Sequence, residues 1–437
     1  MDEERRARVV VSTIARAKTS VSSLRYQQFK ILSAHGQCHH GAVDGVENDK
    51  LNMGKIRIVA VIGTRPEAIK LVPVILAARE RSHLFEVKVV QTGQHRELVD
   101  QLMLEFGIKA DANLNVMQPN QDLSYVLAES VRGLSQLFAR ENPDWVLVQG
   151  DTTTTLAGAL AGFYNCGRVG HVEAGLRTGD RHSPFPEEIN RALTTRLADI
   201  HFAPTELARR NLLREGISSE EILVTGNTVV DALLHTLSRI QVEAPSKSRY
   251  ILVTAHRREN HGPALLEICE ALRGLLTRFR DVRAILPMHP NPNVRDVLVS
   301  RLGAHDRITL TEPLGYTEFV KVLNASVLVL TDSGGVQEEC AVLGKPMLVM
   351  REHTERPEAL DPDVAILVGT DPAKIVEVGS RFLNDANKTS KKQALSGKFG
   401  DGSASIQILD ALLRRRDLSI KPVSFQGASQ LRLGSLT

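Results

Sequence analysis

The chain has 437 residues, of which 42% are hydrophobic and 24% are charged, and its formal net charge is +3. This composition predicts a globular protein with two or three domains and an ample core. The small net charge argues against nucleic acid or a membrane surface as the main partner, so an anionic ligand must be met by local cations. Cys38, Cys166, Cys269 and Cys340 form no CxxC pair and indicate neither a disulfide framework nor a zinc site. No apolar run approaches the roughly 18 residues of a membrane span.

Residues 1–54 differ in character from the rest of the chain. They are rich in Arg and Ser, as organelle transit peptides are, but their acidic start argues against one. They also contain no apolar h-region of a secretion signal. We expect a poorly ordered extension on a cytoplasmic protein, for which Met53 would be a natural start.

The first expected strand and helix follow at once. Residues 55–62 (KIRIVAVI) are a β-branched run of strand length, and GTRPEAIKLVPVILAARE after them has helical periodicity. Thr64 and Glu67 match a capping box, with a proline in the first turn. Arg65 and Lys70 are two further cations at this helix N-terminus, and they predict an anion site, the alternative being a solvated helix start.

Strands and helices then alternate up to about residue 240, as in DWVLVQGDTTTTLAGALAGFY and ILVTGNTVVDALL. This alternation predicts an α/β fold with a parallel, doubly wound sheet. The sequence contains neither GxGxxG at the first turn nor GxxxxGK[ST]. A nicotinamide cofactor and a P-loop kinase are therefore not expected.

Two carboxylates stand at expected strand ends in this half, where open α/β sheets bind their ligands, and a third lies in a proline-flanked loop. Asp151 ends an apolar run, although it could instead cap the helix that follows. Glu173 lies among apolar residues and glycines in GHVEAGL, where an unpaired carboxylate would be costly to bury. Glu187, with Glu188 beside it, follows two prolines that stiffen its loop, although a surface turn would look the same. These acids are candidates for one pocket.

Residues 241–248 (QVEAPSKS) predict a linker to a second alternating series that starts at YILVTAHRREN. Two doubly wound halves would place a cleft between them, and such clefts are preferred ligand sites. In LTDSGGVQEE a strand passes into a helix through a Ser-Gly-Gly turn at residues 333–335. The N–H groups of this turn could approach a diphosphate, the alternative being a plain turn. His256 and His289 follow expected strands and are either titratable site residues or structural histidines.

Residues 403–416 (SASIQILDALLRRR) predict an amphipathic helix that closes the second half. The predicted organisation is an extension at 1–54, a Rossmann-like domain at 55–240, a second one at 241–416 and a tail at 417–437. We assign the tail no function.

These motifs together resemble one family. From about residue 55 to residue 416 the chain is similar to the non-hydrolysing UDP-N-acetylglucosamine 2-epimerases. The shared blocks, in the family's order, are GTRPEAIK, TGQHRE, GDTTTT, GHVEAGLRTGD, PEEINR, TGNTVVDALL, HRREN, HPNPNVR, TDSGGVQEE and MREHTERPEA. Ten blocks in order are a far more specific signal than any one of them.

The resemblance implies a glycosyltransferase-B architecture, with the active site between two Rossmann-like domains. It implies interconversion of UDP-N-acetylglucosamine and UDP-N-acetylmannosamine without a metal or nicotinamide. Loss of UDP would give a glycal intermediate, and UDP would add back after a proton reaches the opposite face of C2. Such chemistry needs acid and base groups around the sugar and cations around the diphosphate. The resemblance also implies a homodimer, a second UDP-sugar as activator and a role in polysaccharide biosynthesis.

Site residues are carried over block by block. The resemblance makes Asp151, Glu173 and Glu187 the acid/base cluster, and places His256 beside the leaving diphosphate. Which carboxylate serves which face of C2 stays open, because coupled carboxylates share their titration. The implied substrate-binding residues are Arg65, Lys70, Leu314, Phe319, Ser333, Gly334, Gly335, Glu339 and Arg356. Gln94, His95 and His289 match positions of the activator pocket.

The chain departs from the family pattern at Gln149, where members often have His, and at Phe185, where Trp is common. Neither change removes a proposed catalytic group, so we expect activity to survive and affinity to differ. A hydrolysing 2-epimerase is the first rival, but the intact activator blocks and the lack of a fused sugar-kinase domain disfavour it. The other rivals are a glycosyltransferase of the same fold and a nucleotide-sugar sensor without catalysis. The retained acids argue against both.

Overall fold

The computed structural model describes residues 54–93, 96–118, 121–165, 167–240, 249–257, 260–289, 291–384 and 397–416. The extension up to residue 53, the linker at 241–248 and the tail at 417–437 lie outside the described residues. So do Gln94, His95, Cys38 and Cys166. None of the described helices is long and apolar enough to cross a membrane.

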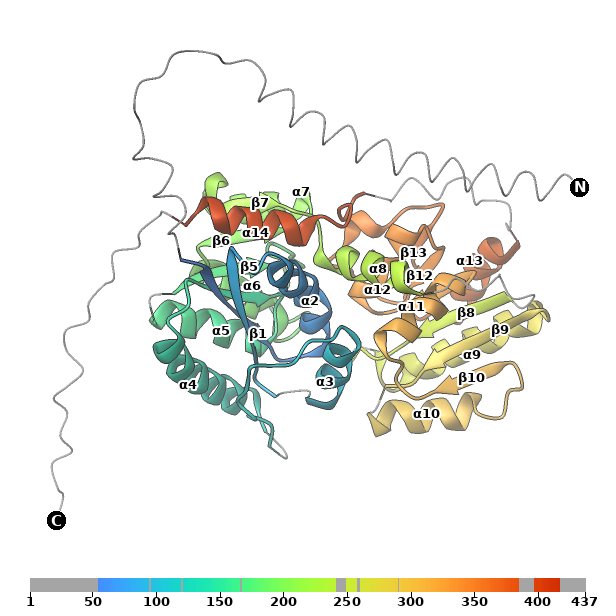
Figure 1. The fold of residues 1–437 in the computed structure, drawn as a ribbon. Helices are drawn as coiled ribbons and strands as arrows, with labels where there is room; N and C mark the ends of the chain where they lie inside the picture. Colours follow the sequence, from blue (N-terminus) through green and yellow to red (C-terminus); the bar gives the residue numbers. More distant parts are fainter. Residues whose placement is uncertain are drawn as a thin grey trace, which may run out of the picture. The chain divides into compact units, whose positions relative to one another are not determined.

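The first half of the described chain forms a parallel sheet of seven strands in the order β3-β2-β1-β4-β5-β6-β7 (Figure 1). Its strands are β1 (Ile56–Ile62), β2 (Phe85–Gln91), β3 (Ala112–Asn113), β4 (Trp145–Gln149), β5 (Arg168–Val172), β6 (Ile200–Ala203) and β7 (Ile222–Val224). The helices between and after them are α2 (Arg65–Glu80), α3 (Arg96–Glu105), α4 (Leu123–Glu141), α5 (Thr153–Tyr164), α6 (Glu187–Leu197), α7 (Glu206–Arg214), the 3-10 helix η2 (Ser219–Glu221) and α8 (Thr228–Arg239). The expected doubly wound sheet is confirmed.

The alternation of side chains along β1 explains why helices cover both faces of this sheet. Ile58 and Ile62 point into a core shared with α2 and α3. Val59 and Val61 point the other way, into a core shared with α4 and α5. Because successive residues of a strand face opposite sides, an uninterrupted apolar run requires two apolar layers. Full burial of each such side chain contributes roughly 1.5–3 kcal/mol.

The second half forms a parallel sheet of six described strands in the order β10-β9-β8-β11-β12-β13. These strands are β8 (Arg249–Thr254), β9 (Val282–Pro287), β10 (Ile308–Thr311), β11 (Leu328–Thr331), β12 (Met347–Val349) and β13 (Ala365–Leu367). The helices are α9 (Pro263–Arg278), α10 (Pro292–Leu302), α11 (Tyr316–Ala325), α12 (Gly334–Leu343), the 3-10 helix η4 (Pro357–Ala359), α13 (Pro372–Asn384) and α14 (Ala404–Arg414). Helices α9, α10 and α13 share a core with one face of the sheet, and α11 and α12 with the other.

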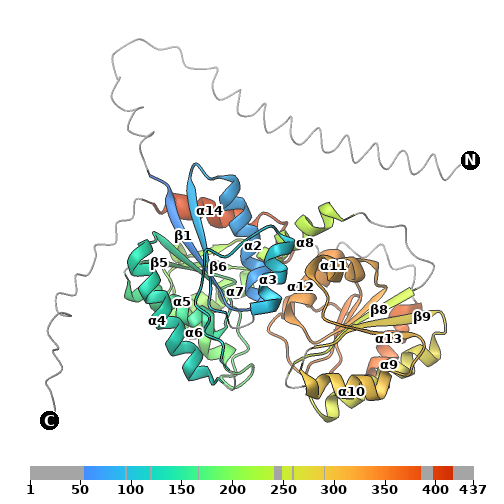
Figure 2. The same ribbon diagram turned by 60° about the horizontal axis from the view of Figure 1, so that its bottom comes forward.

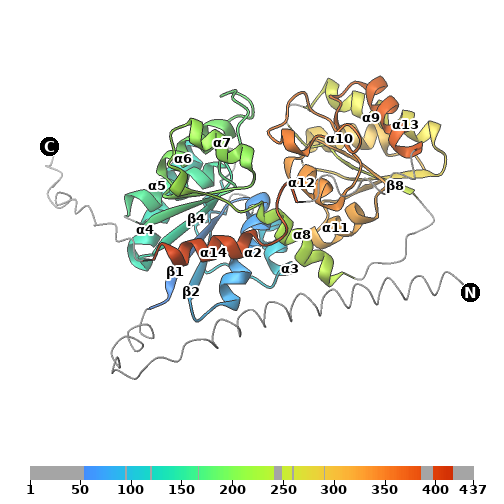
Figure 3. The same cartoon turned by 90° about the horizontal axis from the view of Figure 1, so that it is seen from above.

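Two helices pack across the two halves of the chain. Helix α8 contributes Leu233 to the core of the first sheet and Val229 to a core of the second. Helix α14, expected to close the second half, instead buries Leu409 and Leu412 with α2 and α8 (Figure 3). Its amphipathic pattern predicts a buried face but does not say which helices cover that face. Asp231 of α8 holds the start of α14 by accepting the Ser405 N–H at 2.8 Å.

Two fully buried histidines lie on neighbouring strands of the first sheet. His171 of β5 and His201 of β6 face each other edge to face, with ring centroids 6.4 Å apart. The Nε2 of His171 lies 2.8 Å from the carbonyl oxygen of Gly150, so this nitrogen carries the proton. Burial lowers the pKa of His171 to about 4 and that of His201 to about 3.

These lowered pKa values predict a loss of stability in mild acid. Both rings are neutral in the folded state, whereas the unfolded chain takes up protons below about pH 6.5, so stability falls as the pH drops below that value. The slope is up to about 1.4 kcal/mol per pH unit for each histidine. Thermal unfolding of His201→Phe should therefore lose less Tm between pH 7 and pH 5 than the unmodified chain. The exposed His83→Gln is the control, and equal losses in all three proteins would contradict the prediction.

Candidate active site

The strand orders of the two sheets place a switch point in each half. In the first sheet β1 and β4 are neighbours, and in the second β8 and β11 are neighbours. The chain leaves each such pair towards opposite sides, and ligands of open α/β sheets bind outside the carboxyl ends of these strands. Asp151 follows β4, while His256 and Ser333 follow β8 and β11. The sequence candidates thus lie at the positions that the topology favours.

Glu173, the residue after β5, is a buried carboxylate surrounded by donors. The Nζ of Lys70 lies 2.6 Å from both of its oxygens. Asn227 Nδ2 donates to Oε1 at 2.8 Å, and Gln149 Nε2 donates to Oε2. The backbone of Glu173 is left-handed, with φ at 64°, a strained conformation for a residue with a Cβ. Such strain persists where the surroundings over-determine it, which is common at functional sites.

Arg356, just before η4, adds the second half of the chain to this cluster. Its Nη2 donates to Glu173 Oε1 at 3.2 Å, its Nε to Glu338 Oε1 at 2.6 Å and its Nη1 to Glu355 Oε1 at 2.7 Å. The amide of Asn227 also donates to Glu338 Oε2 at 2.8 Å. Buried ion pairs therefore join residues that follow strands of both sheets.

The charges of this cluster determine the protonation of Glu173. Burial alone would raise the pKa of its carboxyl group, but the Lys70 and Arg356 charges oppose burial and lower it to about 2. In the same cluster burial raises the pKa of Glu338, against the Arg356 charge. Removal of one partner from a buried ion pair typically costs about 3–5 kcal/mol, because the other charge is left unpaired.

Asp151 is not the cap of α5. That cap is Thr152, whose hydroxyl accepts the Thr155 N–H at 3.1 Å. The Asp151 carboxylate pairs instead with Arg191 of α6, and its carbonyl accepts from Asn190 Nδ2 at 3.0 Å. The first turns of α6 therefore lie against the Asp151 loop.

The adjacent Glu187 and Glu188 differ in environment. Glu188 is buried and accepts the backbone N–H groups of Thr178 at 3.1 Å and Gly179 at 3.0 Å, so it orders that loop. Glu187 is half-buried in the first turn of α6 rather than in a plain surface turn. Burial raises the pKa of Glu187, and the Asp151 charge raises it further.

Glu67 links the start of α2 to the Asp151 loop. Its Oε2 accepts the N–H groups of Gly63 at 3.0 Å and Thr64 at 2.6 Å, so the predicted carboxylate cap is confirmed. Its Oε1 accepts the hydroxyl groups of Thr152 at 2.7 Å and Thr155 at 3.1 Å. The capping residue thus also fixes α2, which carries Lys70, relative to the loop that carries Asp151.

His256 lies at the carboxyl end of β8 in a loop that Asp332 holds. The buried carboxylate of Asp332 accepts the backbone N–H groups of His256 at 2.8 Å and Arg257 at 2.9 Å. Its other oxygen lies 3.2 Å from His256 Nδ1. Partial desolvation lowers the pKa of His256, and the Asp332 charge opposes this shift. The ring of His289 stacks on His256, with centroids 6.0 Å apart, so this expected activator residue adjoins the expected diphosphate residue.

The remaining expected substrate residues surround the starts of α11 and α12. Gly335 has open space at the position of a Cβ, whereas a Cβ on Gly334 would lie 2.3 Å from Arg356 Nη1. Glu339 is buried and accepts the Tyr316 hydroxyl at 2.8 Å, and burial raises its pKa to about 7. Leu314 and Phe319 are both half-buried, in the loop before α11 and on that helix. Arg65, expected at an anion site, donates from Nη2 to the Leu314 carbonyl at 2.8 Å.

Sequence reasoning missed several residues that hold this site. Asp332 ends a strand just as Asp151 does, so the same rule could have found it. Asn227, Glu338 and Arg191 have no comparable local signal, because their partners are distant in the sequence. Gln149, noted only as a departure from a family pattern, supplies an N–H donor to Glu173.

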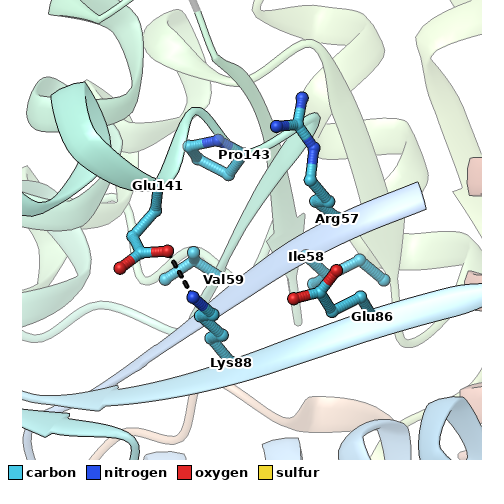
Figure 4. Close-up of a pocket in the computed structure, with 7 residues that line it drawn as sticks. All are labelled: Arg57, Ile58, Val59, Glu86, Lys88, Glu141 and Pro143. Atoms are coloured by element: carbon cyan, nitrogen blue, oxygen red, sulfur yellow. Dashed lines mark hydrogen bonds and ion pairs between the residues drawn. The ribbon is translucent and has the colours of Figure 1, made fainter. Parts of the chain in front are cut away.

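Figure 4 shows a surface hollow elsewhere on the first half. Its lining residues are Arg57, Ile58, Val59, Glu86, Lys88, Glu141 and Pro143. They lie in the amino-terminal halves of β1 and β2 and beside them, and Lys88 pairs with Glu141. The hollow is therefore remote from the strand ends that carry the candidate acids. Within the described ranges, no group of three or more His, Cys, Asp or Glu side chains is arranged to hold a metal ion.

Comparisons with known proteins agree with this geometry. The model of the UDP-N-acetylglucosamine 2-epimerase family matches residues 77–413. The chain is 46% identical over 374 residues to the UDP-N-acetylglucosamine 2-epimerase of Escherichia coli K12, covering 83% of this chain and 99% of that protein. It is 44% identical over 365 residues to that of Bacillus subtilis 168, covering 83% of this chain and 96% of the relative.

Solved structures give the same result. The crystal structure of UDP-GlcNAc 2-epimerase from Neisseria meningitidis bound to UDP-GlcNAc matches with a TM-score of 0.79 and 42% identity. The match covers 82% of this chain and all of that one. The fold, the motifs and these matches agree, and the chain belongs to the UDP-N-acetylglucosamine 2-epimerase family.

Proposed function

We propose that this protein interconverts UDP-N-acetylglucosamine and UDP-N-acetylmannosamine by epimerisation at C2, without hydrolysing the sugar. The observation that carries the proposal is the Glu173 cluster, which joins one carboxylate of the first half to cations of both halves. The family membership supports the reaction, and the Neisseria relative with UDP-GlcNAc bound supports the substrate.

The reaction needs two kinds of group in one place. A base removes the C2 proton while the C1–O bond breaks, and UDP leaves to give a glycal. A proton then reaches the opposite face of C2, and a phosphate oxygen of UDP re-forms the bond to C1. Acid and base groups must therefore surround the sugar, and positive charge must stabilise the leaving diphosphate.

The acids of the first half differ in their suitability for proton transfer. Glu187 is half-buried, its pKa is raised, and it adjoins the Asp151 loop through α6. A carboxyl group with a raised pKa keeps its proton at higher pH than an ordinary glutamate, which suits proton transfer. Glu173 accepts from four side chains and its pKa is lowered to about 2, so it suits a permanent negative charge. We assign proton transfer to Glu187 with Asp151, and the placement of Lys70 and Arg356 to Glu173.

The second half supplies the groups for UDP in this proposal. His256 and the N–H groups at Ser333, Gly334 and Gly335 would stabilise the diphosphate, with Arg65 and Lys70 from the first half. Leu314 and Phe319 would flank the uracil, and Glu339 would accept ribose hydroxyl groups. Gln94, His95 and His289 would bind a second UDP-sugar as activator. A cytoplasmic location and a role in polysaccharide biosynthesis rest on the resemblance alone.

Proton NMR of the purified protein with UDP-N-acetylglucosamine in deuterium oxide tests the reaction. We expect UDP-N-acetylmannosamine to appear with deuterium at C2, because the proton returned to C2 comes from solvent. Accumulation of UDP and free N-acetylmannosamine would instead establish the hydrolysing rival. Unchanged, undeuterated sugar despite measured binding would leave the transferase or the sensor.

Two amide substitutions test the division of roles. Glu187→Gln should lower kcat about 10²–10⁴-fold and abolish deuterium uptake while the UDP Kd changes little, because it removes a proton carrier. The acidic limb of the pH–rate profile should disappear with it. Glu173→Gln should also raise KM and the UDP Kd, because Lys70 and Arg356 lose the negatively charged carboxylate that holds them in place. The opposite pattern, with deuterium uptake lost in Glu173→Gln at unchanged affinity, would reverse the assignment.

We also propose a homodimer. Large apolar side chains are exposed on α5 and α6, which pack on each other: Phe163 is 60% and Leu193 is 48% exposed. Exposed apolar side chains of this size are typical of subunit contacts when they form a patch.

Sedimentation equilibrium should give twice the chain mass, and Leu193→Glu should shift the measured mass towards that of the monomer. A monomer at all concentrations would refute the proposal.

A further inference from the structure

Helix α11 begins without a cap from its own segment. Its N-cap position is Gly315, which offers no side chain to the first N–H groups of the helix. Glu105, the last residue of α3, supplies the acceptors instead. Its Oε1 accepts the Tyr316 N–H at 3.2 Å, and its Oε2 accepts the Thr317 N–H at 2.9 Å. A carboxylate at a helix N-terminus also interacts favourably with the helix dipole.

This cap comes from the other half of the chain. Helix α3 packs on the first sheet, whereas α11 follows β10 of the second half, and the two lie side by side in Figure 2. The neighbouring Phe106 lies with its ring centroid 6.0 Å from that of Tyr316. Both rings are buried in the core of the first sheet. The start of α11 is thus held from the first half by hydrogen bonds and by packing.

The approach of Glu105 explains the glycine at position 315. The backbone of Gly315 has φ −58° and ψ 160°, which any residue can adopt. A Cβ at this position, however, would lie 2.3 Å from Glu105 Oε1. A side chain at this position would therefore act by displacing the carboxylate and not by straining the backbone.

The capped turn lies between two expected nucleotide-binding elements. Leu314, expected beside the uracil, precedes Gly315, and its carbonyl accepts from Arg65. The hydroxyl of Tyr316 donates to Glu339, expected at the ribose. Any movement of the start of α11 would therefore displace Leu314 and the Tyr316 hydroxyl that Glu339 accepts.

We propose that Glu105 is a positioning residue for the nucleoside diphosphate: by capping α11 across the two halves, it holds Leu314 and, through the Tyr316 hydroxyl, Glu339 where they receive UDP. The inference rests on the proposed function, since it assigns a role at the same nucleotide site. Glu105 itself does not touch the reacting atoms.

Calorimetric titration with UDP, together with epimerase kinetics, tests the role. Glu105→Ala should raise the UDP Kd and KM about three- to tenfold, the range expected for a lost helix cap, with a smaller change in kcat. Glu105→Gln keeps one oxygen acceptor and should recover part of the affinity. Glu97→Ala, an exposed acid at the start of the same helix, is the matched control and should bind as the unmodified chain does.

A double substitution separates this contact from a general effect on folding. Gly315→Ala alone should weaken UDP binding, because its Cβ displaces the carboxylate. In the Glu105→Ala background the added methyl group should change the UDP Kd little further, because the carboxylate that it would displace is absent. Additive losses, or a Gly315→Ala variant with unchanged affinity, would show that the cap does not form in solution and would overturn the inference.

The outcomes also distinguish this inference from the proposed function. If the unmodified protein neither binds UDP nor epimerises the sugar, the proposed function fails. If it does both and Glu105→Ala binds UDP equally well, only the positioning role fails. An equal loss in Glu97→Ala would attribute the effect to α3 in general and would also refute the role of Glu105.

Discussion

The burial of Glu173 is the constraint on which the rest of the site depends. A carboxylate removed from water needs compensating charge and hydrogen bonds, and here Lys70, Arg356, Asn227 and Gln149 supply them. The left-handed backbone at Glu173 turns its side chain into this cluster at the expense of local strain. Since the donors come from both halves, the same carboxylate that organises the cations also ties together the two sheets.

The two halves share more than this ion cluster. Helix α8 belongs to a core of each sheet, and its N-cap residue, Asn227, contacts the carboxylates of Glu173 and Glu338. Helix α14 returns from the second half to pack on α2 and α8, and Asp231 holds its first turn. Helices α8 and α14 therefore link the two halves of the chain. This link restricts how far one half can move without the other.

The sequence predicts those features that local patterns encode. Apolar runs and turn residues predicted the two parallel sheets, and the sequence correctly placed Asp151, Glu173 and His256 after strands. Pairings between distant segments could not be predicted. The amphipathic pattern of α14 indicates a buried face but not the helix that covers it. Glu105 resembles any surface acid near a helix C-terminus, where its charge is locally unfavourable. Its role emerges only when α11, more than 200 residues later, presents uncapped N–H groups to it.

Glu173 and Glu187 illustrate how the environment sets the protonation of identical side chains. Glu173 and Glu187 have the same intrinsic acidity. Glu173 is surrounded by cations, whereas Glu187 is partly buried and lies near the negative charge of Asp151. The pKa values consequently move apart, one down to about 2 and the other upwards. In the proposed reaction, a fixed negative charge would hold the cations that bind the diphosphate, and a carboxyl group that exchanges its proton would act at C2. A single carboxylate could not supply both, because the donors that stabilise the charge also weaken the base.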